Sequence, residues 1–286
     1  MDCITRLGVV GCGLMGSGIA EVAALAGLDV RVAEAASDAA EAGRRRVTAS
    51  LDRGVKRAKL TEEDRDRALA GLSFTHDVGD LADRQFVVEA VAENRAIKID
   101  VIRSLDKVVE DPVAILATNT SSIPIVDLAV ATERPGQVIG MHFFNPVPVQ
   151  RLVEVIPGLT TSADTERRTR AFAERLGKTT VRAADRAGFV VNALLIPYLL
   201  GAVRMVESGS ARPEDIDQGM ELGCAHPMGP LRLLDLIGLD TAQAIAESMY
   251  DEYKEPLYAS PALLRRMVAA GHLGRKSGRG FYAYGN

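Results

Sequence analysis

The feature that most constrains the fold is a glycine-rich turn near the start of the chain, "VVGCGLMGSG", in which Gly11, Gly13 and Gly16 keep the spacing GxGxxG. An apolar run at 6–11 predicts a buried strand before the turn, and residues 14–27 carry apolar side chains at helical spacing after it. In this context Gly11 permits the tight turn, Gly13 lets a pyrophosphate approach the backbone, and Gly16 lets the helix pack on the strand. The pattern therefore predicts a dinucleotide site at the positive end of the helix dipole.

A second strand is predicted at 29–34 and ends in Glu34, where an acid can accept both hydroxyls of the adenine ribose. A carboxylate at this position would repel a 2′-phosphate, and no arginine follows until Arg44, so we expect NAD rather than NADP. The alternative for Glu34 is a solvated acid at a strand end. Leu14 and Met15 begin the helix and complete the turn expected to contact the cofactor.

Strands continue to alternate with helices in the first part of the chain, which is typical of a mostly parallel sheet covered on both faces. Further strands are predicted at 85–91, 114–119 and 138–144, and helices at 39–60, 61–72 with Thr61 as N-cap, 95–109 and 122–131. After Arg186 the pattern is helical, with helices predicted at 188–208, 213–223, 230–235, 240–254 and 261–270. We predict an α/β fold with a Rossmann-like NAD-binding domain over 1–184 and an all-α domain for substrate binding or dimerisation over 185–286.

Composition restricts the possible partners. A net charge of -4, with 47% hydrophobic and 25% charged residues, gives no general attraction to nucleic acid or to anionic membranes. The uncharged stretch 188–203 is shorter than the roughly 20 residues that span a bilayer. It also contains Asn192 and Pro197, so a helix buried on all sides is expected.

The cysteines are odd in number and lack the spacing of a metal site: Cys3, Cys12 and Cys224. No charged-then-apolar signal segment precedes the first strand. These features favour a reduced, cytoplasmic compartment and no bound metal.

The stretch "MHFFNPVPVQRLVEVI" places an imidazole, His142, and a carboxylate, Glu154, in apolar surroundings where each group alone is costly to bury. The predicted strand carries His142 to a strand end, where α/β sheets bind ligands. Asn145-Pro146 then turns the chain, and "RLVEVI" brings Glu154 back. The unperturbed pKa of histidine, roughly 6.5, suits the proton transfer that accompanies hydride transfer to a nicotinamide. A carboxylate on the other ring nitrogen would orient the imidazole.

The alternative is a core histidine bonded to backbone and a glutamate on an edge strand. The other histidines lack an equally convincing carboxylate partner: His76, His226 and His272. Because a dinucleotide turn lies upstream, we expect His142 and Glu154 to act as a pair.

Six segments carry a resemblance to a known family: "GVVGCGLMGSGIAEVAALAG", "ATNTSSIPI", "GMHFFNPVPV", "AGFVVNALLIPYLL", "AHPMGPLRLLDLIGLD" and "LGRKSGRGFY". Over essentially the whole chain they resemble the L-3-hydroxyacyl-CoA dehydrogenase family, most nearly its short 3-hydroxybutyryl-CoA dehydrogenases of actinobacterial type. The resemblance implies reversible oxidation of an L-3-hydroxyacyl-CoA to the 3-ketoacyl-CoA with NAD. It also implies a Rossmann-like first domain and a helical second domain that mediates homodimerisation.

The resemblance also implies roles for single residues. His142 matches the catalytic histidine and Glu154 its partner, Ser121 matches a serine that contacts substrate and cofactor, and Asn192 matches an asparagine near the thioester carbonyl. Positions that match cofactor contacts are Glu93, Lys98, Asn145 and Lys276. From the residues alone, Ser121 could instead cap a helix, Asn192 could bond a backbone group, and Lys276 could be a solvated loop lysine.

The phosphates of coenzyme A require a cationic patch, and the helical stretch 50–60 carries Arg53, Lys56, Arg57 and Lys59. The family uses a serine and a lysine here, which align best with Ser50 and Arg57, so an arginine replaces the lysine. The alternative is a solvated charged face. A further departure is Ala193, where many relatives carry an arginine.

We therefore predict an NAD-dependent L-3-hydroxyacyl-CoA dehydrogenase that prefers short chains such as 3-hydroxybutyryl-CoA. One alternative is a dehydrogenase of a free β-hydroxyacid, although those enzymes usually use a catalytic lysine. Another is a non-catalytic dinucleotide-binding relative, against which the presence of every proposed catalytic group argues.

Overall fold

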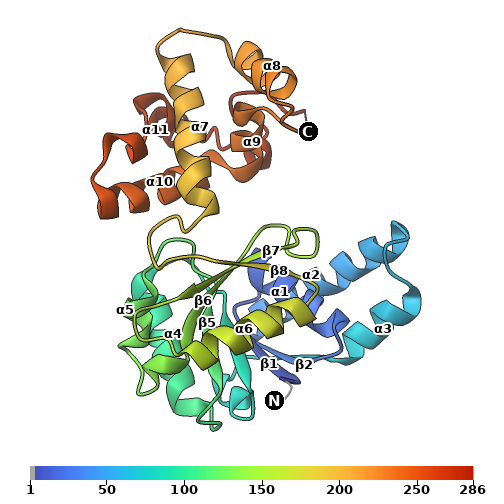
Figure 1. The fold of residues 1–286 in the computed structure, drawn as a ribbon. Helices are drawn as coiled ribbons and strands as arrows, with labels where there is room; N and C mark the ends of the chain where they lie inside the picture. The colour runs from blue at the N-terminus through green and yellow to red at the C-terminus, as the bar shows by residue number, and fades with distance from the viewer. Residues whose placement is uncertain (1–3, 286) are drawn as a thin grey trace. The chain divides into compact units, whose positions relative to one another are not determined.

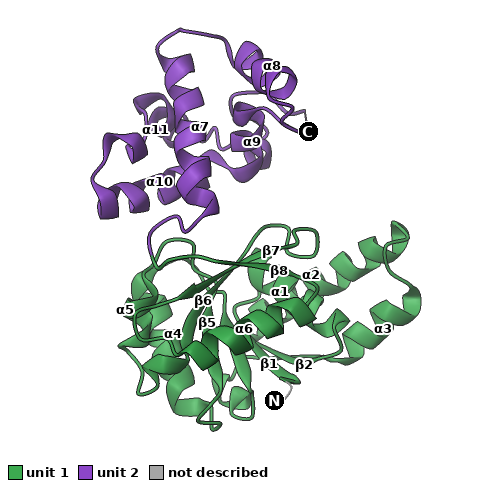
Figure 2. Cartoon of the chain, viewed as in Figure 1, with its two compact units in different colours: residues 1–185 green, residues 186–286 purple. Residues whose placement is uncertain are grey.

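The computed structural model describes residues 4–285, and the chain divides into two compact units, residues 1–185 and 186–286 (Figure 2). Cys3 lies outside the described residues. The first unit is built from strands and helices, and the second is helical (Figure 1).

The first unit contains one sheet. In the described part of the chain its eight strands follow the order β3-β2-β1-β4-β5-β6-β7-β8. The strands are β1 (Arg6–Val10), β2 (Asp29–Ala33), β3 (Leu72–Thr75), β4 (Phe86–Glu89), β5 (Ile115–Thr118), β6 (Val138–Phe143), β7 (Leu152–Pro157) and β8 (Thr179–Arg182). Neighbouring strands are parallel except for the antiparallel pair β6 and β7. Because the strand order reverses between β1 and β4, this is where a Rossmann-like sheet binds its ligand, beyond the carboxyl ends of the strands. The predicted fold class is confirmed.

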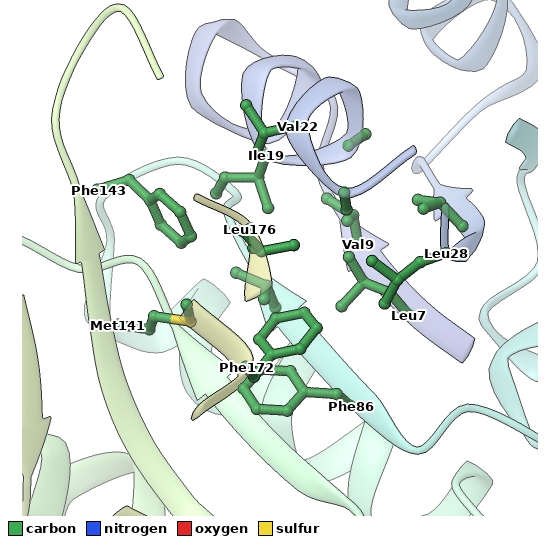
Figure 3. Packing of buried hydrophobic residues seen from close by; sticks show 14 of the residues in the cluster. Leu7, Val9, Ile19, Val22, Leu28, Phe86, Met141, Phe143, Phe172 and Leu176 are labelled. Atoms are coloured by element: carbon green, nitrogen blue, oxygen red, sulfur yellow. The ribbon is translucent and has the colours of Figure 1, made fainter. Parts of the chain in front are cut away.

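Helices cover both faces of this sheet. They are α1 (Leu14–Leu25), α2 (Ser37–Lys56), α3 (Glu62–Ala70), α4 (Arg95–Val108), α5 (Ile125–Ala129) and α6 (Ala163–Arg175), with short 3₁₀ turns η1 (Val78–Leu81) and η2 (Pro135–Gln137). On one face α1 and α6 share an apolar core with the strands, and Figure 3 shows Leu176 between Ile19 and Phe172. The rings of Phe86 and Phe172 stack there with their centroids 4.4 Å apart. Helices α4 and α5 contact β4, β5 and β6.

Local sequence explains where these elements begin. Thr61, predicted as an N-cap, accepts the Asp64 N–H at 3.0 Å, and the Asp64 carboxylate accepts the Thr61 N–H at 3.3 Å. This reciprocal capping box satisfies backbone donors that the first turn of α3 leaves without helical partners. The predicted cap is confirmed.

Two edge strands and one helix are among the elements that were not predicted. Strands β3 and β8 lie at the two edges of the sheet and have no fully buried residue, so neither shows an apolar run. Helix α6 buries a narrow stripe that includes Thr165 and Thr169, which weakens its apolar period. Its start is marked instead by Ser162, whose hydroxyl accepts the Thr165 N–H at 3.1 Å.

The second unit consists of α7 (Val191–Glu207), α8 (Pro213–Gly223), α9 (Pro230–Ile237), α10 (Leu239–Tyr253) and α11 (Ala262–Ala269), with 3₁₀ turns η3 (Pro256–Tyr258) and η4 (Arg275–Ser277). The uncharged stretch 188–203 falls largely in α7, which carries Pro197 inside the helix and packs one side into the core of this unit. The prediction of a helix buried on all sides is wrong, because Leu194 is 75% exposed. Across residues 4–285 no helix has the length and apolar character needed to cross a membrane.

Candidate active site

In the glycine turn between β1 and α1, the backbone conformation and packing leave no room for a side chain at two of the glycines. Gly11 has a φ of +88°, and a Cβ there would lie 2.8 Å from the Ala90 carbonyl oxygen. A Cβ on Gly16 would lie 1.8 Å from the Gly11 carbonyl oxygen. Gly13 differs, because a Cβ there would meet no described protein atom within 4 Å. Its missing side chain therefore leaves room outside the chain, as the approach of a pyrophosphate requires.

Helix α1 begins at this turn, and its own first turn supplies no anion. Its N-cap is Gly13, no side chain caps it, and no acidic residue lies in its first turn. Leu14 is exposed and Met15 is half-buried. The helix start thus presents its positive end without a carboxylate of its own, which fits the phosphates of a dinucleotide.

Glu34 follows β2 and reaches back to the same turn. Its carboxylate accepts the Cys12 N–H, and the Arg46 guanidinium donates to the Cys12 carbonyl. Burial, reinforced by the nearby Glu34 charge and opposed by Arg46, raises the pKa of the Cys12 thiol to about 12. Glu34 therefore stands beside the glycine turn, where a ribose diol would be held. No sequence pattern predicts the contact of Arg46, because this residue of α2 is 34 residues from Cys12 in the sequence.

His142 and Glu154 lie directly opposite each other in the antiparallel ladder of β6 and β7. Residues in such register present side chains on the same face. His142 Nδ1 and Glu154 Oε2 are 2.8 Å apart, and the residues are 7% and 0% exposed. Since an ionised carboxylate only accepts hydrogen bonds, Nδ1 carries the proton and the basic lone pair is on Nε2. The Phe144 ring lies 4.7 Å from the imidazole, between centroids.

The loop between β6 and β7 is held by hydrogen bonds from a buried lysine. Lys178 is buried, and its ammonium donates to the carbonyl oxygens of Val147 at 2.5 Å and Gln150 at 2.9 Å. Burial lowers the pKa of Lys178, and the Glu21 carboxylate partly opposes that shift. Asn145 is exposed in this loop and precedes Pro146 through a cis peptide bond. The loop that joins the His142 and Glu154 strands is thus fixed by a buried cation that no sequence motif reveals.

Ser121 lies in a turn whose hydroxyl and N–H groups donate hydrogen bonds to the Glu93 carboxylate. Glu93 Oε1 accepts hydrogen bonds from Thr120 Oγ1 at 2.5 Å, the Ser121 N–H at 2.9 Å and Ser122 Oγ at 3.1 Å. Burial would raise the pKa of Glu93, but the Lys98 ammonium and these hydrogen bonds outweigh it and hold that pKa below its ordinary value. The N-cap of α5 is Pro124, so Ser121 does not cap that helix.

The residues expected to bind coenzyme A lie on α2 or just beyond its end at Lys56, so the predicted helix to residue 60 ends earlier. Burial raises the pKa of Glu21, partly opposed by a hydrogen bond from Ser50 and by the charges of Arg53 and Lys178. Arg57 is the exposed C-cap of α2. Of the cations on this stretch, Arg53 acts on the Glu21 carboxylate, and Arg57 lies at the end of the helix.

Two expected site residues belong to the second unit. Asn192 lies in the first turn of α7 and is 8% exposed. Lys276 lies in η4, and its ammonium is 2.6 Å from Asp240 Oδ1. Burial would raise the pKa of Asp240, but Lys276 and backbone hydrogen bonds bring it below its ordinary value.

The fold and the glycine turn are typical of a class of protein, the dehydrogenases that bind a nicotinamide dinucleotide. Residues 6–186 match the family described as 3-hydroxyacyl-CoA dehydrogenase, NAD binding domain, and residues 188–284 match its C-terminal domain. The chain is 58% identical over 284 residues to a 3-hydroxybutyryl-CoA dehydrogenase of Mycobacterium tuberculosis, covering 99% of each protein.

Solved structures give the same result. The crystal structure of M. tuberculosis FadB2 matches with a TM-score of 0.98 and 57% identity, over 99% of this chain and 100% of that one. An (S)-3-hydroxybutyryl-CoA dehydrogenase, PaaH1 of Ralstonia eutropha, matches with a TM-score of 0.95 and 45% identity over the same shares. The chain belongs to the 3-hydroxyacyl-CoA dehydrogenase family, as predicted, and its cofactor is NAD.

Proposed function

We propose that the protein oxidises L-3-hydroxybutyryl-CoA to acetoacetyl-CoA reversibly with NAD, through proton transfer at His142. The observation that carries the proposal is the contact of 2.8 Å between His142 Nδ1 and Glu154 Oε2 in a buried setting. The names of the relatives in M. tuberculosis and R. eutropha support the choice of a four-carbon substrate.

Each member of the pair has a separate task. His142 Nε2 takes the proton of the substrate hydroxyl, and Glu154 holds the imidazole in one tautomer and stabilises the imidazolium that forms. When bound, NAD supplies the hydride acceptor for the substrate carbon. Because Glu154 is fully buried, water screens its charge poorly, which strengthens its effect on His142 at 2.8 Å.

The remaining residues bind and orient. We assign the pyrophosphate to Gly13 and the first amides of α1, and the adenine ribose to Glu34. Further cofactor contacts are proposed for Gly11, Leu14, Met15, Gly16, Glu93, Lys98, Ser121, Asn145 and Lys276. We assign the substrate hydroxyl and thioester carbonyl to Ser121 and Asn192, and the phosphates of coenzyme A to Ser50 and Arg57.

We also infer a homodimer formed through the helical unit and a cytoplasmic location. The family resemblance supports the dimer, and the bacterial relatives support the location. Light scattering coupled to size exclusion would give twice the chain mass for a dimer, and a monomer mass at micromolar concentration would contradict it.

The test of the function compares substrates and cofactors. We expect rapid NADH oxidation with acetoacetyl-CoA and about 10²-fold lower kcat/KM with free acetoacetate, because the coenzyme A contacts are then lost. With NADPH, Glu34 would face the 2′-phosphate, so kcat/KM should fall by about tenfold or more. Equal rates with acetoacetate and its thioester would contradict the proposal and favour a free β-hydroxyacid. NADH binding without any turnover would favour a non-catalytic role.

A further inference from the structure

A second buried carboxylate lies at the carboxyl end of β4, in the same sheet as the His142 and Glu154 pair. The mechanism proposed above does not use it. Glu89 ends β4 and is 0% exposed. Its Oε1 accepts hydrogen bonds from Lys98 Nζ at 2.7 Å and from the Val91 N–H at 2.7 Å, and its Oε2 accepts from Thr118 Oγ1 at 2.6 Å. One side chain thus joins α4, the turn after β4, and β5.

Lys98 is equally enclosed. It is 1% exposed, and its ammonium lies 2.7 Å from Glu89 Oε1, 3.3 Å from Glu93 Oε2 and 3.4 Å from the Val91 carbonyl oxygen. An ammonium has only donors, so a buried lysine depends on acceptors placed around it. The shorter of its two carboxylate contacts is to Glu89, which therefore does most to set where the Lys98 charge stands.

The backbone places Glu89 between two elements proposed to bind the cofactor. In the sheet register Glu89 pairs with Val10 on one side and with Thr118 on the other. Gly11 follows Val10, and a Cβ on Gly11 would lie 3.0 Å from the Val91 nitrogen that Glu89 holds. On the other side, the Asn119 N–H donates to the Glu89 carbonyl at 2.8 Å, two residues before Ser121.

The same register relates Glu89 to His142. Thr118 pairs with Gly140 on β6, so Glu89, Thr118 and Gly140 form one row across the sheet. His142 lies two residues further along β6, on the same face as Glu89, because side chains alternate along a strand. The Cα atoms of Glu89 and His142 are therefore roughly 12 Å apart, since the residues lie two strands apart across the sheet and two residues apart along it. Glu89 is thus too far to exchange a proton with His142 directly, and its influence must pass through the groups that it holds.

We propose that Glu89 is a positioning residue of the cofactor site, which fixes Lys98 and the turn at Val91 and thereby sets the place of Glu93 and Ser121. The inference rests on the proposed function, because that function gives Glu93, Lys98 and Ser121 their contacts with the cofactor. Replacing a buried ion pair by apolar groups of similar volume is often neutral for stability or stabilising, so stability alone is a weak reason for this arrangement. A positioning role accounts for a charged side chain with three directed partners.

The experiment replaces Glu89 by glutamine and measures NADH binding and turnover separately. Glu89→Gln keeps the shape but removes the charge that holds Lys98. We expect the Kd for NADH to rise about tenfold, in line with the loss of a charge-assisted hydrogen bond, and kcat at saturating NADH and acetoacetyl-CoA to stay within about threefold. An unchanged Kd for NADH in a folded Glu89→Gln protein would overturn the proposal.

A matched control separates positioning from folding. Asp106 lies near the opposite end of α4 and accepts from Arg134 Nε and from the Glu133 N–H, both at 2.8 Å. Asp106→Asn removes a charge from the same helix, and we expect it to lower the melting temperature while leaving the Kd for NADH unchanged. An equal rise in Kd for Asp106→Asn would reduce the Glu89 effect to general loosening of α4 and overturn the proposal.

A second variant guards against loss of folding in Glu89→Gln. Thr118→Val keeps the Glu89 charge but removes the hydrogen bond to Oε2, and we expect the Kd for NADH to rise about threefold. No rise would contradict the positioning role. Failure of the proposed function is distinguishable, because it would show as NADH binding by the unaltered protein without turnover of acetoacetyl-CoA, and the comparison of Kd values would still stand.

Discussion

Two buried polar groups lie on one face of the same sheet and are built differently. The first is the pair of His142 and Glu154, formed across one antiparallel ladder. The second is the cluster of Glu89, Lys98 and Thr118, which joins two parallel strands and a helix. The pair keeps an imidazole 7% exposed, whereas the cluster encloses both of its charges to within 1%. The difference fits the proposed roles, in which the pair acts on the substrate and the cluster positions other groups.

The two groups also differ in how far the sequence reveals them. His142 and Glu154 stand twelve residues apart on either side of an Asn-Pro turn, so a strand, a turn and a returning strand bring them together. Glu89 and Thr118 are 29 residues apart, and Lys98 approaches from a helix between them. A parallel crossover of that length carries no short-range signal of which side chains will meet.

The largest expected effect comes from the pair. His142→Asn keeps a donor near the position of Nδ1 for Glu154 but removes the basic Nε2. We expect kcat to fall by about 10³-fold or more, near the upper range for loss of a general base. The Kd for NADH should stay within about twofold, since no cofactor contact is proposed for His142. Steady-state kinetics with acetoacetyl-CoA and a fluorescence titration with NADH check both parts. Turnover close to that of the unaltered protein would show that His142 is not the proton acceptor.

The fold was largely predictable where side-chain periodicity is strong. The strand and the helix around the glycine turn follow from the continuous apolar run at 6–11 and from the apolar side chains at helical spacing over 14–27. The edge strands β3 and β8 were not predictable, because they bury too little to leave an apolar pattern. The roles of Glu93 and Lys98 came only through family resemblance. Arg46, Lys178 and Glu89 carry no motif, since each acts on a backbone or side-chain group distant in sequence.

A middle-sized effect should separate the two buried carboxylates. Glu154→Gln and Glu89→Gln make the same chemical change at two residues that are both 0% exposed. Glutamine at 154 still accepts the Nδ1–H of His142 but no longer stabilises an imidazolium, so kcat should fall by about 10–100-fold with little change in the Kd for NADH. Glutamine at 89 should show the opposite division, with the Kd raised and kcat nearly unchanged. Measuring both parameters for both variants tests the comparison, and the same division in the two proteins would refute it.

The smallest expected effect concerns Glu93, which belongs to the edge of the cluster and keeps 37% of its side chain exposed. The pKa of Glu93 is lowered in the folded state, so the folded chain favours the ionised form of this side chain. The resulting stability is present above the unfolded pKa of roughly 4.3 and is lost as the pH falls through the lower folded value. At pH 7, Glu93→Gln should therefore lower the free energy of unfolding by about 1 kcal/mol or less, because exposure weakens such contacts. Below pH 4 the difference should shrink, since a protonated glutamate resembles glutamine. Urea unfolding of both proteins between pH 3 and pH 7 measures this difference in the free energy of unfolding. A difference that grows toward low pH would mean that Lys98 and the turn at 120–122 do not hold Glu93 in its ionised form.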